Sequence, residues 1–159
     1  MRYRAQASRP EHFYWLKSRT GCALEDGFRA IEVTDPHDVD WCSLCQNWHA
    51  RIKGMTGFTG WTVNSVSIHV AMETPLALRM LAPASFHYAF REANKRFLVG
   101  LTAGDNEKAL RLNRLLGFKE VYRHKDGWSD GIDMVLQELR REEWEKDPRA
   151  WIRTWMKEK

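Results

Sequence analysis

Apolar and polar residues follow their clearest pattern between Phe97 and Phe118. The stretch opens with the apolar run 97–99, which is too short for a helix and suits a buried strand. Residues 103–105 then break the pattern. Beyond them, apolar residues recur at helical spacing and predict one buried helix face: Ala109, Leu112 and Leu116.

Two residues predict the limits of this helix. Asn106 is of a helix-capping type, because its side-chain oxygen accepts a hydrogen bond from a backbone N–H one turn further on. Gly117 stands where a helix needs a left-handed residue to end, and Phe118 begins a second strand. The pattern therefore predicts a strand, a short loop, a capped helix and another strand.

Shorter segments also have strand patterns. They are 3–7, 28–33, 52–58, 62–70, 119–122 and 132–136. Glycine-containing stretches predict turns at 57–60, 125–127 and 129–131. In the segment 62–70, alternation places His69 on the face opposite Val66, Ile68 and Val70.

Cap residues close to prolines predict the starts of further helices. Ser8 caps the first, which has Pro10 in its first turn and ends near Gly21. Asp35 and Pro36 start the second. Its apolar stripe consists of Trp41, Leu44, Cys45 and Trp48.

A third helix follows the strand 62–70. Thr74 caps it and Pro75 takes the first helical position. The helix is expected to run to about Asn94. Pro83 removes an internal hydrogen bond, so we expect a kink or a split there.

The last helix begins at Asp147 and Pro148. Its apolar side consists of Trp151, Ile152, Trp155 and Met156. The helix either packs on its own domain or docks on another subunit, because an undocked pair of Trp residues exposes a large apolar patch. We expect residues 1–139 to form one domain and residues 140–159 to form a C-terminal helical tail.

Composition narrows the class of protein. A chain of 159 residues suits one domain, and no apolar run is long enough to span a bilayer. No signal peptide follows Met1, and three cysteines do not make a secreted disulfide framework. We therefore expect a soluble, cytoplasmic protein. The net charge of +4 favours a polyanionic ligand, whereas no basic stripe interleaved with aromatics predicts a nucleic-acid partner.

The unit 97–118, with N-x-x-A at Asn106 and Ala109 and a final Gly117-Phe118, resembles the GNAT N-acetyltransferases. The resemblance covers roughly Thr62 to Leu136. It implies an α/β (α+β) fold with a mixed, mostly antiparallel sheet flanked by helices. An ordinary βαβ segment of another α/β domain is the alternative.

The resemblance implies that acetyl-CoA is the cosubstrate and that the helix start after the central strand binds its pyrophosphate. A helix N-terminus suits an anion, because N–H donors converge there. The cofactor-binding residues implied are Ile68, Val70, Thr74, Leu76, Ala77, Leu78, Arg79, Asn106 and Ala109. The family's G-x-G/A loop is missing from residues 72–79, and residues 68–71 (IHVA) are similar to divergent, phage-encoded members.

Two residues are candidates for catalysis. His69 can take a proton from an amine, or it can be a hydrogen-bonded core residue. Asn113 stands where many family members have a tyrosine that protonates the leaving thiolate. An amide donates a hydrogen bond but has no proton to release near neutral pH. We therefore expect a slow or selective enzyme in which Asn113 orients the thioester sulfur or a water.

A zinc site is a separate hypothesis. It would use His37, Cys42, Cys45 and His49. C-x-x-C with nearby histidines can form a four-ligand site, but the two cysteines also suit the apolar side of a helix.

The function that the resemblance implies is direct acetyl transfer from acetyl-CoA to a primary amine of a small molecule or protein, with a backbone N–H near Val70 polarising the thioester carbonyl. Motifs for nucleotide hydrolysis, serine hydrolysis and metalloproteolysis are absent from the sequence. The alternative is a non-catalytic protein of the same fold, such as a phage or virion component that assembles through the tail. A possible homo-oligomer would use the same helix.

Overall fold

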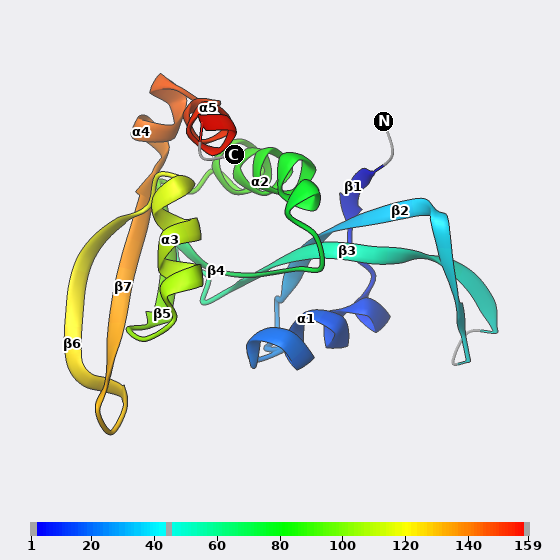
Figure 1. Ribbon diagram of the computed structural model, residues 1–159, viewed down its shortest axis with the longest axis horizontal. Helices are drawn as coiled ribbons and strands as arrows, with labels where there is room; N and C mark the ends of the chain where they lie inside the picture. Colours follow the sequence, from blue (N-terminus) through cyan, green and yellow to red (C-terminus); the bar gives the residue numbers. More distant parts are fainter. Residues whose placement is uncertain (1–2, 44–45, 158–159) are drawn as a thin grey trace. The chain divides into compact units, whose positions relative to one another are not determined.

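The computed structural model describes residues 3–43 and 46–157, and only the backbone of Cys42 and of residues 154–157. Seven strands form a mixed sheet in the order β1-β2-β3-β4-β5-β7-β6 (Figure 1). β4 pairs with β5 in parallel, whereas the pairs β1–β2, β2–β3, β5–β7 and β6–β7 are antiparallel. The expected α+β class with a mostly antiparallel sheet is confirmed.

The chain divides into two compact units. The first comprises Met1–Thr59 and His69–Tyr88, and the second comprises Gly60–Ile68 and Ala89–Lys159. Strand β4 (Ser65–Met72) begins in the second unit and ends in the first.

The first unit contains three further strands and two main helices. The strands are β1 (Arg4–Ala7), β2 (Arg29–Cys42) and β3 (Asn47–Thr59). The helices are η1 (Pro10–His12), α1 (Phe13–Thr20), η2 (Pro75–Ala77) and α2 (Leu78–His87). The π-helix η3 (Tyr88–Glu92) follows α2; it begins at the last residue of the first unit and its other residues belong to the second. Figure 1 shows α1 and α2 on opposite sides of β3.

Two glycines of β3 explain how closely these helices pack. A Cβ on Gly57 would lie 2.5 Å from a methyl group of Leu16 in α1. A Cβ on Gly54, on the other face, would lie 3.2 Å from the Cβ of Ala77. Glycine at both positions therefore lets each helix approach the strand.

The second unit contains strands β5 (Phe97–Ala103), β6 (Lys119–Ser129) and β7 (Ile132–Arg140). Its helices are α3 (Glu107–Leu115), α4 (Arg141–Lys146) and α5 (Ala150–Lys157). Val135, Gln137 and Leu139 of β7 are buried at every second position, whereas β6 is exposed along its length. This contrast fits a central strand and an edge strand.

The predicted unit 97–118 is confirmed. β5 is followed by α3, whose cap is Asn106, and Gly117 has a φ of 94°. Between Asn106 and Leu116 the buried residues are Leu110 and Leu116, so the buried face is rotated slightly from the one expected. The caps at Thr74 and Gly21 are also confirmed.

The helix predicted from Asp35 is wrong. Those residues continue β2, and β3 begins at Asn47. Trp41 and Trp48 have helical spacing, but here they face each other as cross-strand partners with ring centroids 5.6 Å apart. Pairing between two strands has overridden a local pattern that suits either structure.

Three smaller predictions also differ. Ser8 does not cap a helix, because its hydroxyl donates to Glu32 instead. Residues 125–127 lie within β6, where Asp126 has a φ of 52° and the register with β7 shifts. Pro83 lies inside α2 without ending it, and the π-helix begins five residues later.

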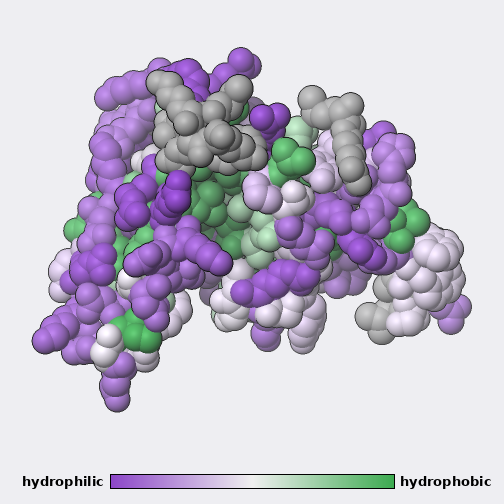
Figure 2. Space-filling view, viewed as in Figure 1, coloured by the Kyte–Doolittle hydropathy of each residue, from purple (hydrophilic) through white to green (hydrophobic). Residues whose placement is uncertain are grey.

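Other observations concern surface and metal binding. The visible face is largely hydrophilic (Figure 2). Within the part of the chain that the structure describes, no helix is long and apolar enough to cross a membrane. Nor do those residues include a cluster of three or more metal-ligating side chains. Cys45 and the side chain of Cys42 lie outside the described residues, so the zinc hypothesis stays a prediction.

Candidate functional site

The turn after β4 presents both exposed and buried residues. Thr74 accepts a hydrogen bond from the backbone N–H of Leu76 at 3.4 Å. Ala77 is fully buried and Leu78 is 3% exposed, so both side chains belong to the core. Leu76 and Arg79 are exposed. The backbone N–H groups of Leu76, Ala77 and Leu78 already bond within the turn. The turn therefore presents the exposed side chain of Arg79 to a ligand, and the two buried residues hold the turn in place.

His69 on β4 is half-buried. Its Nε2 lies 2.9 Å from the hydroxyl of Thr59. Burial lowers the pKa of His69 below the usual 6.5, and the negative charge of Glu25 opposes this only in part. The imidazole is therefore mainly neutral at pH 7, with Nδ1 as the nitrogen that Thr59 does not contact. Its strand neighbours Ile68 and Val70 are also half-buried.

In the second unit, Asn106 caps α3 as predicted, accepting a hydrogen bond from the N–H of Ala109 at 3.1 Å. Asn113, two turns along the helix, has both amide hydrogens engaged. Its Nδ2 donates to Gln137 at 2.7 Å and to Thr102 at 3.3 Å. These bonds hold α3 against β5 and β7, so the amide has no hydrogen left to donate to a ligand.

The ladder between β4 and β5 is short. Ser65, Val66 and Ser67 pair with Phe97, Leu98 and Val99. Both strands then continue, β4 to Met72 and β5 to Ala103.

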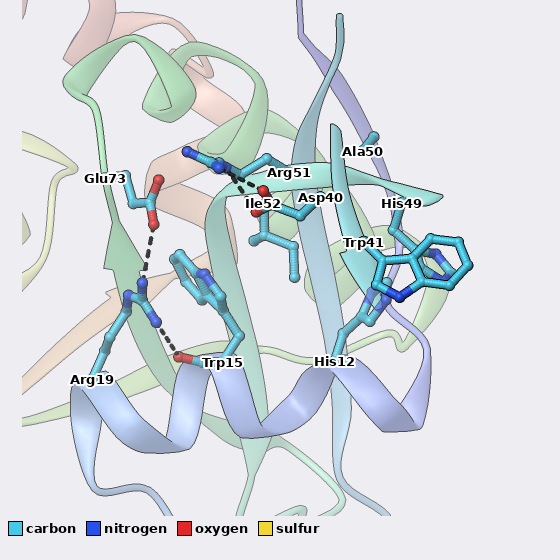
Figure 3. A pocket seen from close by; sticks show the side chains of 10 residues that line it. All are labelled: His12, Trp15, Arg19, Asp40, Trp41, His49, Ala50, Arg51, Ile52 and Glu73. Carbon is cyan, nitrogen blue, oxygen red and sulfur yellow. Dashed lines mark hydrogen bonds and ion pairs between the residues drawn. The ribbon is translucent and has the colours of Figure 1, made fainter. Parts of the chain in front are cut away.

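A cavity of about 360 Å³ lies in the first unit, and the sequence did not indicate it. Figure 3 shows His12, Trp15 and Arg19 rising from η1 and α1 towards side chains of β2 and β3. The rest of its wall includes Trp41, His49, Ile52 and two acidic residues, Asp40 and Glu73. Ligand sites in proteins commonly have this size and mixture of aromatic and polar side chains.

Each carboxylate of this wall has a cationic partner. Asp40 accepts from Nε of Arg51 at 2.8 Å, and this hydrogen bond lowers the pKa of Asp40. Glu73 accepts from Arg19 at 3.0 Å (Figure 3). Alternating charges follow one another from α1 to β2 in the order Arg19, Glu73, Lys53, Asp38, Arg51 and Asp40.

Glu32 lies behind this wall and is completely buried. It accepts three hydrogen bonds of 2.8 Å: from Gln6, from Ser8 and from Nδ1 of His12. His12 therefore lies between a buried carboxylate and the cavity. A charged residue inside the apolar strand pattern 28–33 is the one sequence signal of this arrangement. The sequence around His12 contains no pattern that marks His12 as a functional residue.

Most of the chain is similar in structure to solved N-acetyltransferases. Spermidine/spermine N-acetyltransferase SpeG from Vibrio cholerae has a TM-score of 0.68 and 12% identity over 91% of this chain and 96% of that one. The fold is that of the GNAT acetyltransferases. A dodecameric spermidine N-acetyltransferase from Vibrio cholerae has a TM-score of 0.67 and 13% identity, over 90% of this chain and 96% of that one.

A third structure with the GNAT fold is N-acetyltransferase PseH from Campylobacter jejuni, in complex with acetyl coenzyme A. It has a TM-score of 0.55 and 18% identity, over 82% of this chain and 78% of that one. No protein-family model and no curated protein matches the sequence. The similarity therefore lies in the fold, where the expectation from Asn106, Ala109 and the final Gly117-Phe118 is confirmed.

Proposed function

We propose that this protein transfers an acetyl group from acetyl-CoA to a primary amine of a small molecule or protein, directly and without a covalent enzyme intermediate. The observation that most supports this is the fold shared with N-acetyltransferases over 91% of the chain. One neighbour of that fold, PseH, has acetyl coenzyme A bound. Bound acetyl-CoA would supply the thioester whose carbonyl carbon the amine attacks.

The residues after β4 fit an anionic cosubstrate in part. The side chain of Arg79 would hold the pyrophosphate, while the Thr74 cap and the buried side chains of Ala77 and Leu78 fix that turn. The backbone N–H of Val70 would polarise the thioester carbonyl.

The remaining predicted residues keep proposed roles. Asn106 and Ala109, joined by the cap hydrogen bond, would flank the pantetheine. His69 would take a proton through Nδ1, the nitrogen that Thr59 does not contact. Asn113 would support α3 behind the cosubstrate, because its amide hydrogens are already engaged.

Two measurements test the proposal. Acetyl-CoA at about one hundred times its dissociation constant is expected to stabilise the protein by about 2.7 kcal/mol in thermal melting. Thiol release in the presence of a panel of primary amines then measures acetyl transfer. The proposal fails if millimolar acetyl-CoA neither shifts the melt nor supports thiol release.

The cosubstrate site has its own variant. Arg79→Glu is expected to weaken acetyl-CoA binding, because it reverses a charge beside the phosphates. Arg149→Glu, an equal charge change on an exposed residue before α5, is the control. Ala77→Asp is unsuitable, because Ala77 is fully buried and a charge there would disrupt packing.

A second candidate function is a non-catalytic protein of the same fold, such as a phage or virion component. It is favoured by the lack of glycine in residues 72–79 and by Asn113 in place of a tyrosine. In that protein a second copy would dock through the C-terminal helix. Acetyl-CoA binding without transfer to any amine would support this candidate.

A further inference from the structure

Glu32 is a buried carboxylate that has no role in the acetyl transfer as proposed above. Burying such a group is costly unless hydrogen bonds compensate for lost water. Here Gln6 satisfies Oε1, and Ser8 and His12 both reach Oε2. These three donors come from outside β2, so the chain builds a dedicated environment around one carboxylate.

The bond to Glu32 decides which nitrogen of His12 faces a ligand. A carboxylate only accepts hydrogen bonds, so the ring hydrogen lies on Nδ1, 2.8 Å from Oε2. In the neutral ring, Nε2 then keeps its lone pair. The His12 side chain is 17% exposed and lines the cavity of about 360 Å³. A carboxylate that orients an imidazole in this way is the usual arrangement of a general base.

We propose that this cavity is the acceptor-amine site and that His12 is its general base, with Glu32 as the positioning residue. The inference rests on the proposed acetyl transfer, and it names the acceptor site and class of acceptor. It also gives the proton a different destination from His69, whose Nε2 is bonded to Thr59 and whose strand neighbour Ala71 packs on the core around Leu16.

The proton balance of the step is simple. A primary amine arrives as an ammonium ion and loses one proton to Nε2 of His12, which becomes an imidazolium facing the Glu32 carboxylate. The free amine attacks the carbonyl carbon of the acetyl donor, a C–N bond forms and the C–S bond breaks. The thiolate leaves with the electron pair, and the amide nitrogen releases a second proton to water.

The wall of the cavity indicates the class of amine. Asp40 and Glu73 are already paired with Arg51 and Arg19, so a polycation would have to displace an arginine from each. The indole rings of Trp15 and Trp41 instead offer apolar surface. An amine carried on an aromatic body fits this wall better than a polyamine.

The first experiment compares 2-phenylethylamine and spermidine as acceptors, with acetyl-CoA as donor and thiol release as readout. His12→Asn retains a donor at the position of Nδ1 but has no second nitrogen to take a proton. It is expected to lower kcat/KM for 2-phenylethylamine by about 10²–10⁴-fold, the usual range for a general base. His124→Asn, an exposed residue of β6, is the matched control and should retain wild-type activity.

Chemical rescue separates catalysis from structure. Added imidazole should restore part of the activity of His12→Ala, because it replaces the missing base, and no structural defect would respond in this way. Glu32→Gln should leave activity lower than wild type and unresponsive to imidazole. Wild-type activity in His12→Asn, or a preference for spermidine over 2-phenylethylamine, would overturn the inference.

Measuring amine binding distinguishes a wrong acceptor site from a wrong proposal of acetyl transfer. Titration calorimetry with 2-phenylethylamine should give a signal for the wild type that Trp41→Ala weakens. If acetyl-CoA neither binds nor reacts while this amine signal persists, the transfer proposal is wrong and the cavity remains an amine site. If acetyl transfer proceeds but Trp41→Ala and His12→Asn have no effect, the acceptor site lies elsewhere.

Discussion

Asn113 connects a helix to two strands through one amide group. Its Nδ2 donates to Gln137, which is 1% exposed, and to Thr102. The sequence predicted a catalytic position for Asn113 but not these partners, because Gln137 follows 24 residues later in the chain. A residue's long-range hydrogen bonds are not encoded in its local pattern.

We predict that Asn113→Ala lowers the free energy of unfolding by about 1–3 kcal/mol, because it leaves the buried Gln137 carbonyl without its donor. Urea unfolding measures the change. The double variant Asn113→Ala/Gln137→Met should lose less than the sum of the two single variants, since both partners are then gone. Additive losses would show that the hydrogen bond contributes little.

His69 predicts a pH dependence of stability. Burial lowers its pKa in the folded protein below the usual 6.5, so the unfolded chain binds the proton more readily. Stability attributable to His69 is therefore complete above about pH 6.5 and is lost as the pH falls below it. We expect the melting temperature of His69→Gln to depend less steeply on pH than that of the wild type between about pH 7.5 and 5.5. His124→Gln is the control, and identical slopes for His69→Gln and the wild type would contradict the prediction.

Among the roles of single residues, helix capping was the most predictable from the sequence. Thr74, Asn106 and Gly117 act on backbone groups within a few residues, so their roles can be deduced from the sequence nearby. Ser8 looks like a cap by the same criteria, yet its hydroxyl bonds to Glu32, twenty-four residues away. The difference is made by a tertiary contact, which the residue type does not reveal.

Among the elements, the hairpin of β2 and β3 departs most from the predicted structure. Its strands shift register between Asp35 and Val39, where Pro36 has no N–H to give to a ladder. Beyond the shift, Arg51 bonds to Asp40 across the two strands. Helical spacing of Trp41 and Trp48 predicted a helix, whereas these cross-strand contacts depend on how the chain folds back.

The close approach of α1 to β3 gives a prediction at the same scale. Gly57→Ala should destabilise the protein by about 1–3 kcal/mol, because the new methyl group would lie 2.5 Å from Leu16 and 2.6 Å from Phe28, both buried.

Gly100→Ala in β5 is the matched control. Its nearest neighbour would be Nδ2 of Asn113 at 3.6 Å, an ordinary contact, so it should leave stability within about 1 kcal/mol of wild type. Chemical denaturation measures both. Equal effects of the two substitutions would show that the space around Gly57 is not limiting.

At the scale of the whole molecule, the resemblance carried by Asn106, Ala109 and Gly117-Phe118 was enough for the fold class. The cavity was not predictable, because its wall combines residues from η1, α1, β2 and β3 with Glu73, the residue that follows β4. Only the paired strands and the helix packed on them bring His12, Trp41 and Glu73 to one place. The predicted residues of the cosubstrate site, in contrast, follow one another closely along two short stretches of chain.

The C-terminal tail supplies the last prediction. Trp151 of α5 is 3% exposed within a single chain, and it lines a second cavity with Leu116 and Leu139 of the same unit. Trp151→Ala should therefore lower the free energy of unfolding by about 3–5 kcal/mol, whereas Trp48→Ala, at a position 62% exposed, should change it little.

Deletion from Asp147 onward should also destabilise the protein and lower its melting temperature, because it uncovers Leu116 and Leu139, which are 6% and 3% exposed. Light scattering on the same samples tests the alternative role of the tail. If α5 packs on its own unit, the deletion lowers stability and leaves the oligomeric mass unchanged. If it docks on a second copy, the mass falls with the deletion, and a deletion that changes neither quantity would show that α5 stabilises neither its own unit nor an oligomer.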